Sequence, residues 1–390
     1  MGEYEGYHYA GRAGCLGLPA RLGGQPRLPL WQNHTMEMID RTAREIAERA
    51  DTDPRDRHAV AAWLFICCAL LFALIVLGGV TRLTHSGLSI TEWQPIVGTL
   101  PPLTDTDWAH VFAKYRATPE YRQINPDMSL DAFKRIFWWE YAHRLLGRAI
   151  GLAFLLPYLW FLVRRRIPPG YAGALFAIFV LGGAQGALGW YMVQSGLVDD
   201  PRVSQLRLAA HLGLAFLIFG AMFWVALSLS RAAARRSGNA ALRRFAFLLT
   251  TLTFVMVLAG GLVAGIRAGF AYNTFPLMNG RWIPPGILLL EPWYRNLTDN
   301  MTTVQFDHRL LAWVLAALVP WFAWSVHAAP DVDPQARRAA AFFVVLLVIQ
   351  IALGIATLLL VVPLPLAAAH QAGAVLVFAA ALNASHALRR

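Results

Sequence analysis

Four histidines occupy comparable positions at the starts of apolar segments, namely His143, His211, His308 and His370. The sequence around them repeats. Tyr141–Leu146 matches Phe306–Leu311 at an offset of 165, and Ala209–His211 matches Ala368–His370 at an offset of 159. A lone histidine beside an apolar segment is most often a packing residue, but four at equivalent positions indicate a shared role.

Two imidazoles that face each other inside a helix bundle are typical of bis-histidine haem iron. Zinc or copper needs more ligands than two histidines, and the sequence offers no cysteine or carboxylate pair to complete such a site. Glycines on these segments would admit a flat ligand, although small residues also serve close helix packing. They are Gly147, Gly151, Gly182, Gly183, Gly186, Gly189 and Gly213. Arg144 and Arg309 directly follow histidines, so each guanidinium could pair with a haem propionate or anchor the helix at the interface.

The two repeats differ at one position that matters for chemistry. Glu140 lies three residues before His143, and its equivalent before His308 is Gln305. The spacing of three places Glu140 and His143 on one helix face. A carboxylate there can move protons or stabilise a cation, and an amide cannot. We therefore predict chemistry in the amino-terminal half and electron storage in the carboxyl-terminal half; the alternative is that Glu140 is an exposed residue at a loop edge.

The composition shows which elements must position these residues. The chain has 390 residues, of which 57% are hydrophobic and 15% charged, against about 25% charged in soluble domains. Long segments lack Asp, Glu, Lys and Arg, and about 20 such residues span a bilayer as a helix. The sequence predicts an all-α polytopic membrane protein with eight transmembrane helices, at about 61–80, 141–163, 171–193, 207–229, 244–266, 307–327, 338–361 and 366–386.

Arginines in the short connections predict the orientation of these helices. Arginine clusters follow the predicted second, fourth, sixth and eighth helices, so the positive-inside rule places both termini in the cytoplasm. The long loops, 82–140 and 267–306, then lie outside, and all four histidines lie near the outer face. Because each repeat has four helices, we expect two pseudo-symmetric parallel four-helix bundles, at 58–230 for the substrate haem and 231–390 for a haem cofactor.

Other features narrow the prediction. The net charge of +11 reports topology or anionic lipid in a membrane protein, so nucleic-acid binding is not expected. Cys15, Cys67 and Cys68 form no extracytoplasmic pair and no zinc motif. Residues 1–57 form a polar cytoplasmic tail, partly disordered, without the apolar core of a signal peptide. The start codon is either Met1 or one of Met36 and Met38.

The outer loop before His143 has amphipathic stretches at Trp108–Tyr115 and Leu130–Trp138. Such stretches could lie over the mouth of the amino-terminal bundle as a lid, which is a weaker hypothesis.

Ordered motifs along residues 58–388 resemble one membrane enzyme family, the heme A synthases. The matching segments are Gly78–Thr84, Ser86–Ser89, Trp93 with Pro95, Pro119–Tyr121, Phe133–Lys134, Trp139–Arg144, Gln185–Val193, Ser195–Leu197, Tyr272–Met278, Phe306–Arg309 and His370–Gln371. So many matches in order make the resemblance specific.

The resemblance implies oxidation of the C8 methyl group of heme O to a formyl group, giving heme A for cytochrome oxidase. It implies that His143 and His211 flank heme O and that Glu140 assists catalysis. His308 and His370 would ligate a b-type haem. The implied setting is a bacterial inner membrane, with heme O synthase and oxidase assembly factors as partners and a homo-oligomer as one possible state. The long loops carry no cysteine pair, and in this the chain resembles the proteobacterial and mitochondrial subgroup of the family.

Two other functions would also use four histidines. A dihaem b-type cytochrome for quinol electron transfer explains the histidines but not why only one repeat carries a glutamate. A transporter or haem chaperone built on parallel repeats predicts that bound haem leaves unaltered. Analysis of the pigment distinguishes both from an enzyme.

Overall fold

The computed structural model describes residues 53–94, 97–231 and 239–389, and its regular structure is helical. Eight of its helices are long and apolar enough to cross a membrane, which confirms the predicted number and fold class. They are α2 (Pro54–Leu83), α5 (Leu130–Val163), α6 (Ala172–Gln194), α7 (Gln205–Ser230), α8 (Ala240–Gly265), α10 (Met301–Ala328), α11 (Pro334–Leu359) and α12 (Leu364–Leu388). The predictions for residues 1–52 lie outside the described residues.

Polar side chains cap the first turns of these apolar helices, except those of α6 and α12, which have no side-chain cap. The side chain of Asp53 accepts a hydrogen bond from the amide of Arg55, and Pro54 starts α2. Ser129 caps α5 and Asn300 caps α10 in the same manner. A cap of this kind satisfies backbone amides that have no partner within the helix, so each helix begins at a defined residue.

Helix α5 starts earlier than the predicted residue 141. Its 34 residues run from Leu130, which gives a length of about 51 Å at 1.5 Å per residue, against a hydrocarbon core of about 30 Å. The prediction followed hydropathy, which falls where α5 leaves the apolar layer. The stretch Leu130–Trp138 is therefore the projecting start of α5 and not a separate element, and Glu140 lies within the helix and not at a loop edge.

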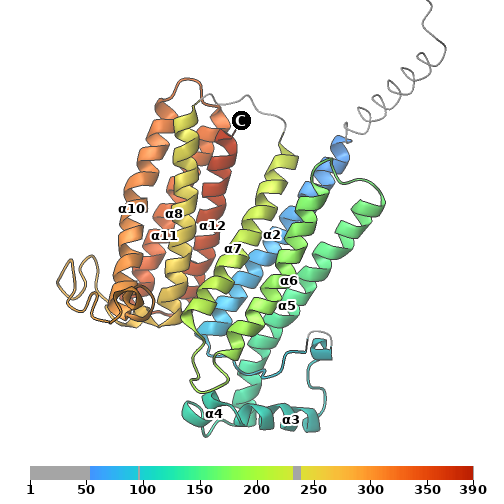
Figure 1. Cartoon of the computed structure of the whole chain (residues 1–390), viewed down its shortest axis with the longest axis vertical. Coiled ribbons are helices and arrows are strands. Elements are labelled where there is room, and N and C mark those ends of the chain that lie inside the picture. The colour runs from blue at the N-terminus through green and yellow to red at the C-terminus, as the bar shows by residue number, and fades with distance from the viewer. Residues whose placement is uncertain (1–52, 95–96, 232–238, 390) are drawn as a thin grey trace, which may run out of the picture. The chain divides into compact units, whose positions relative to one another are not determined.

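The membrane helices pack as two groups (Figure 1). Helices α2, α5, α6 and α7 contact one another, as do α8, α10, α11 and α12. One apolar core lies within the second group, and the other is shared between the first group and residues of α8 and α12; α7 is the most buried of the eight helices. Helix α7 also packs against α8 and α12, and α12 packs against α2. These contacts join the two groups along three helix pairs.

Polar contacts join the two groups near one end. The guanidinium of Arg82, at the end of α2, donates to the carbonyls of Ala264 and Gly265 at the end of α8. The amide of Gln371 on α12 donates to the carbonyl of Ile75 on α2 at 2.7 Å. The ends of α2 and α8 therefore lie at the same level.

A small aromatic domain covers the projecting start of α5. Helices α3 (Asp105–Arg116) and α4 (Pro119–Gln123) lie across it, below the two groups in the view of Figure 1. Their shared core is Trp108, Tyr115, Phe133, Phe137 and Tyr141. Trp108 meets Phe137 edge-on at a centroid distance of 4.9 Å. The stretch Trp108–Tyr115 is thus packed against α5.

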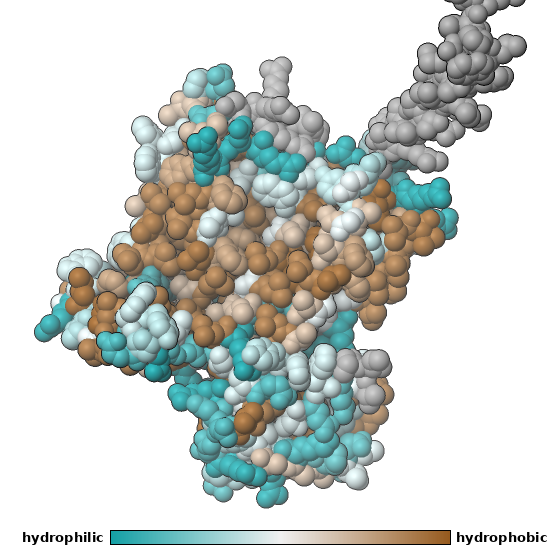
Figure 2. All heavy atoms as spheres, in the orientation of Figure 1, coloured by the Kyte–Doolittle hydropathy of each residue, from teal (hydrophilic) through white to brown (hydrophobic). Residues whose placement is uncertain are grey.

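The sides of the helices are apolar where they face outward. Figure 2 shows a hydrophobic band across the helices between hydrophilic ends. Large side chains such as Leu156, Phe176, Phe247 and Val348 are more than half exposed. Exposed apolar surface of this extent requires lipid around it, so the chain is an integral membrane protein.

Candidate functional site

The four predicted histidines each lie against a glycine of a neighbouring helix. A methyl group at Gly78 of α2 would come 2.9 Å from Cε1 of His143 on α5. At Gly189 of α6 it would come 2.9 Å from Cε1 of His211 on α7. Distances this short exclude a Cβ atom unless the ring moves.

The second helix group has the same contacts at repeat-equivalent positions. A methyl group at Gly260 of α8 would come 3.4 Å from Cε1 of His308, and at Gly354 of α11 it would come 2.8 Å from Cε1 of His370. Gly78 and Gly260 differ by the offset of 182, and Gly189 and Gly354 by 165. Of the glycines named from sequence only Gly189 has this role; Gly151, Gly182, Gly183 and Gly186 border open space.

The histidines fit the requirements of haem ligation. His143 and His211 lie close enough for their charged forms to repel each other, and so do His308 and His370. Among the described residues, all four Nδ1 atoms are buried without a hydrogen-bond partner. Buried imidazoles that keep nitrogen atoms free of protein partners are suitable iron ligands. No group of three or more metal-ligating side chains occurs within the described ranges.

Glu140 is buried and heavily hydrogen-bonded. It is 3% exposed. The Ser89 hydroxyl donates to its Oε2 at 2.7 Å, and the Ile90 amide donates to the same atom at 2.8 Å. The guanidinium of Arg144, one turn further along α5, lies 2.7 Å from Oε1. These donors compensate the burial of a carboxylate charge.

Arg144 also fixes the loop that follows α2. Its guanidinium donates to the carbonyls of Ile90 at 2.8 Å and Glu92 at 3.0 Å. The loop therefore binds Glu140 through Ser89 and Ile90, and Arg144 binds both the loop and Glu140. The guanidinium of Arg144, for which the sequence predicts either a haem propionate or an interfacial role, has protein partners here.

Arg309 makes the equivalent contacts in the other helix group. It donates to the carbonyls of Tyr272 at 2.7 Å and Thr274 at 2.9 Å, which are the positions of Ile90 and Glu92 plus 182. Where the first group has Glu140, this group has Gln305, which is 3% exposed and donates to the Tyr272 carbonyl at 3.3 Å. The amide thus replaces the carboxylate in an otherwise similar frame.

Sequence reasoning missed two residues near Glu140. Ser89 lies in a motif that matched the family, but nothing in its spacing assigns it to the site. Glu120, on α4, is 4% exposed and interacts electrostatically with Glu140. Both come from segments more than 15 residues away along the chain, so only folding reveals the contacts.

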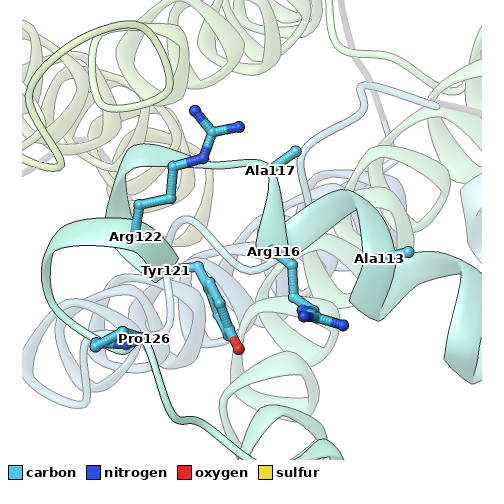
Figure 3. Close-up of a pocket in the computed structure, with 6 residues that line it drawn as sticks. All are labelled: Ala113, Arg116, Ala117, Tyr121, Arg122 and Pro126. Carbon is cyan, nitrogen blue, oxygen red and sulfur yellow. The ribbon is translucent and has the colours of Figure 1, made fainter.

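Two cavities lie on the loop side of the helices. One of about 520 Å³ lies between α3 and α4 and is lined by Ala113, Arg116, Ala117, Tyr121, Arg122 and Pro126 (Figure 3). The guanidinium of Arg116 lies 5.7 Å from the ring centre of Tyr121, whereas Arg122 points away from both in Figure 3. The other, of about 330 Å³, is lined by Thr84, His85, Ile124, Asn125, Met128, Ile136 and Arg267. Neither is lined by the four histidines.

Comparison with known proteins agrees with this arrangement. A family model described as cytochrome oxidase assembly protein, COX15-CtaA, matches residues 61–382. A heme A synthase from Nitrosospira multiformis is 61% identical over 348 residues, which cover 88% of this chain and 98% of that protein. One from Nitrosomonas eutropha is 56% identical, covering 85% and 94%, and one from Parvibaculum lavamentivorans is 48% identical, covering 86% and 96%. The buried histidines, the Glu140 site and these matches lead to one conclusion: the chain belongs to the cytochrome oxidase assembly family that contains the heme A synthases.

Proposed function

We propose that this chain is a heme A synthase that oxidises the C8 methyl group of heme O to a formyl group. The family membership supports the reaction. The observation that carries the assignment of residues is the buried Glu140, which has Ser89, Ile90 and Arg144 as partners in one helix group and an amide at the equivalent position in the other.

In this proposal the two histidine pairs have different ligands. His143 and His211 hold heme O as substrate, and His308 and His370 hold a b-type haem as resident cofactor. When bound, that haem supplies one-electron redox chemistry. The glycines opposite the rings orient the imidazoles because any larger residue would displace them.

Glu140 acts where charge and protons appear during the oxidation. Each hydroxylation removes two electrons and two protons in total from the methyl carbon and one water molecule; a haem held by His308 and His370 would supply the one-electron chemistry by which these electrons leave. Two hydroxylations give a geminal diol, which loses water to leave the formyl group. The Glu140 carboxylate takes a proton from the attacking water or stabilises positive charge on the carbon. Ser89 and Arg144 keep the carboxylate oriented.

We also propose that the two helix groups, 58–230 and 231–390, are parallel structural repeats. The recurring histidine–glycine and arginine–carbonyl contacts support this proposal. Both termini would be cytoplasmic and the haem sites would lie near the outer face of a bacterial inner membrane. Heme O synthase and oxidase assembly factors are the expected partners, and a homo-oligomer is compatible with the exposed apolar faces.

The test is replacement of Glu140 in purified protein supplied with heme O. The Glu140→Gln variant should lose about 100-fold or more of heme A formation, because an amide cannot accept the proton. Haem content should stay unchanged. The Asp131→Asn variant, which removes an exposed carboxylate from the start of the same helix, is the control. Normal heme A formation by the Glu140→Gln variant contradicts the assignment.

The haem pigments identify the two histidine pairs. Replacement of His308 by Ala should remove the resident b-type spectrum, and replacement of His143 should remove retention of heme O. The opposite result would exchange the roles of the two groups. If the wild-type protein returns heme O unaltered in every assay, the dihaem electron-transfer alternative replaces the enzyme.

A further inference from the structure

Glu120 is a second buried carboxylate beside the proposed catalytic centre. It lies in α4, where Thr118 caps the helix and Pro119 starts it. It is 4% exposed, and its Oε2 has no hydrogen-bond partner in the part of the chain that the structure describes. A buried carboxylate oxygen without a partner is costly, and packing alone does not explain it.

Groups from three other elements face Glu120. Tyr115 of α3 hydrogen-bonds to it, Glu140 of α5 repels its negative charge, and Arg267, which follows α8, attracts that charge. Burial first, and Glu140 second, raise the pKa of Glu120 to about 7, against the opposing effects of Tyr115 and Arg267. Near neutral pH this carboxyl group is therefore present in both its protonated and its ionised form.

The surroundings of Glu120 also lead to a cavity with both polar and apolar walls. The amide of Asn125 donates to the Tyr115 hydroxyl at 2.9 Å, and Arg267 lies 3.1 Å from Nδ1 of His85. Asn125, His85 and Arg267 line the cavity of about 330 Å³. A cavity of this size with polar walls has room for several water molecules. Two neighbours of Glu120 thus connect it with this cavity on the loop side.

We propose that Glu120 and Glu140 form a carboxylate pair that carries protons from the oxidation site to this cavity. The inference rests on the proposed function. Glu120 acts through Glu140, so it is a positioning residue for protons and not a catalytic residue. The burial of both carboxylates supports this pair, and so does the cavity beside Asn125, whose backbone amide donates to the Glu120 carbonyl at 3.1 Å.

The transfer follows from the repulsion between the two carboxylates. At rest the pair holds one proton, on Glu120, and Glu140 is ionised beside Arg144. When Glu140 takes a proton from the attacking water, the repulsion disappears and Glu120 releases its proton to water in the cavity. The proton on Glu140 then moves to Glu120, which restores the resting pair. One proton has left the site and no other charge has changed.

The first experiment measures the carboxyl proton itself, by infrared spectroscopy of the complete protein as a function of pH. The wild type should lose a protonated-carboxyl band with a midpoint near pH 7, the Glu120→Gln variant should lack that band, and Asp131→Asn should keep it. In the Glu140→Gln variant the midpoint should fall, because the repelling charge is gone. A midpoint that is unchanged by Glu140→Gln overturns the pair.

The second experiment measures heme A formation against pH. The Glu120→Gln variant should turn over at least about tenfold more slowly, and the rise of rate through pH 7 expected for the wild type should be absent while haem content is unchanged. Glu120→Asp should restore part of the rate. A wild-type pH profile in Glu120→Gln overturns the relay.

These two readouts keep the inference separate from the proposed function. If Glu120→Gln does not fold, the infrared comparison of wild type with Glu140→Gln still tests the pair. If the wild type makes no heme A, the proposed function fails while the infrared result stands or falls by itself.

Discussion

Three groups stabilise and orient the buried carboxylate of Glu140. Ser89 and Ile90 bind one oxygen and Arg144 binds the other. Gln305 has similar burial but only one hydrogen bond, to the Tyr272 carbonyl, among the contacts that the structure gives it. A single atom, oxygen in place of nitrogen, therefore separates a site that can accept a proton from one that cannot.

A residue-scale prediction concerns the glycines that face the histidines. Gly354→Ala should weaken retention of the b-type haem by about tenfold, since its Cβ would lie 2.8 Å from Cε1 of His370 and overpacking costs about 1–3 kcal/mol. Gly182→Ala, which meets open space, is the matched control. The measurement is the haem content of the two purified variants. Equal haem retention by Gly354→Ala and Gly182→Ala would contradict the close contact between Gly354 and His370.

A second residue-scale prediction concerns pH and stability. Because the folded-state pKa of Glu120 is raised from 4.5 to about 7, the folded protein binds this proton more tightly than the unfolded chain. Stability from this group is complete below about pH 4.5 and is lost as the pH rises to about 7. Thermal unfolding in detergent at pH 5 and pH 8 should therefore differ more for the wild type than for Glu120→Gln. The same difference in both proteins would refute the shift.

At the scale of elements, one arginine in each helix group holds a loop against a helix. Arg144 joins the loop after α2 to α5, and Arg309 joins the loop after α8 to α10. Only Arg144 also neutralises a buried carboxylate. The two loops therefore have similar backbone contacts but different electrostatic needs.

This difference predicts unequal costs. Arg144→Ala should destabilise the protein by about 3 kcal/mol or more, because it leaves Glu140 buried without its partner. Arg309→Ala should cost about 1 kcal/mol for each lost hydrogen bond. Thermal unfolding gives the order of stability, and hydrogen exchange of the two loops shows which one is released. An equal loss in the two variants would mean that the ion pair contributes nothing.

At the scale of the whole molecule, the two helix groups meet through α2, α7, α8 and α12. Arg82 and Gln371 add polar contacts across that interface. The ends that carry the histidines, the two loops and α3–α4 therefore lie on one side of the molecule. If the arginine-rich connections mark the cytoplasmic side, the haem sites face the other side.

Labelling of introduced cysteines tests that orientation. In a background with Cys15 replaced by Ser, an impermeant maleimide should label Asp105→Cys in intact spheroplasts and label Asp331→Cys only after lysis. Asp105 and Asp331 are both exposed, so each introduced cysteine is the control for the other. The native Cys67 and Cys68 are buried and should not react. Labelling in the reverse order would invert the topology.

The sequence by itself determined the eight spans, the four histidines and the difference between Glu140 and Gln305. Hydropathy reveals the spans because it depends on residues that are close along the chain, and the repeat reveals the histidines and the Glu140–Gln305 difference because it compares two stretches of sequence directly. Hydropathy missed the true start of α5, since the first turns of that helix are covered by α3 and α4 and not by lipid.

Only the tertiary structure decided what surrounds those residues. The glycine against each histidine, the donors to Glu140 and the approach of Glu120 all join segments that are distant in sequence. Such contacts depend on how helices pack against one another, and many partners are compatible with the same local pattern. The sequence thus predicts which groups carry the chemistry, whereas the packing of the helices determines which side chains surround each of these groups.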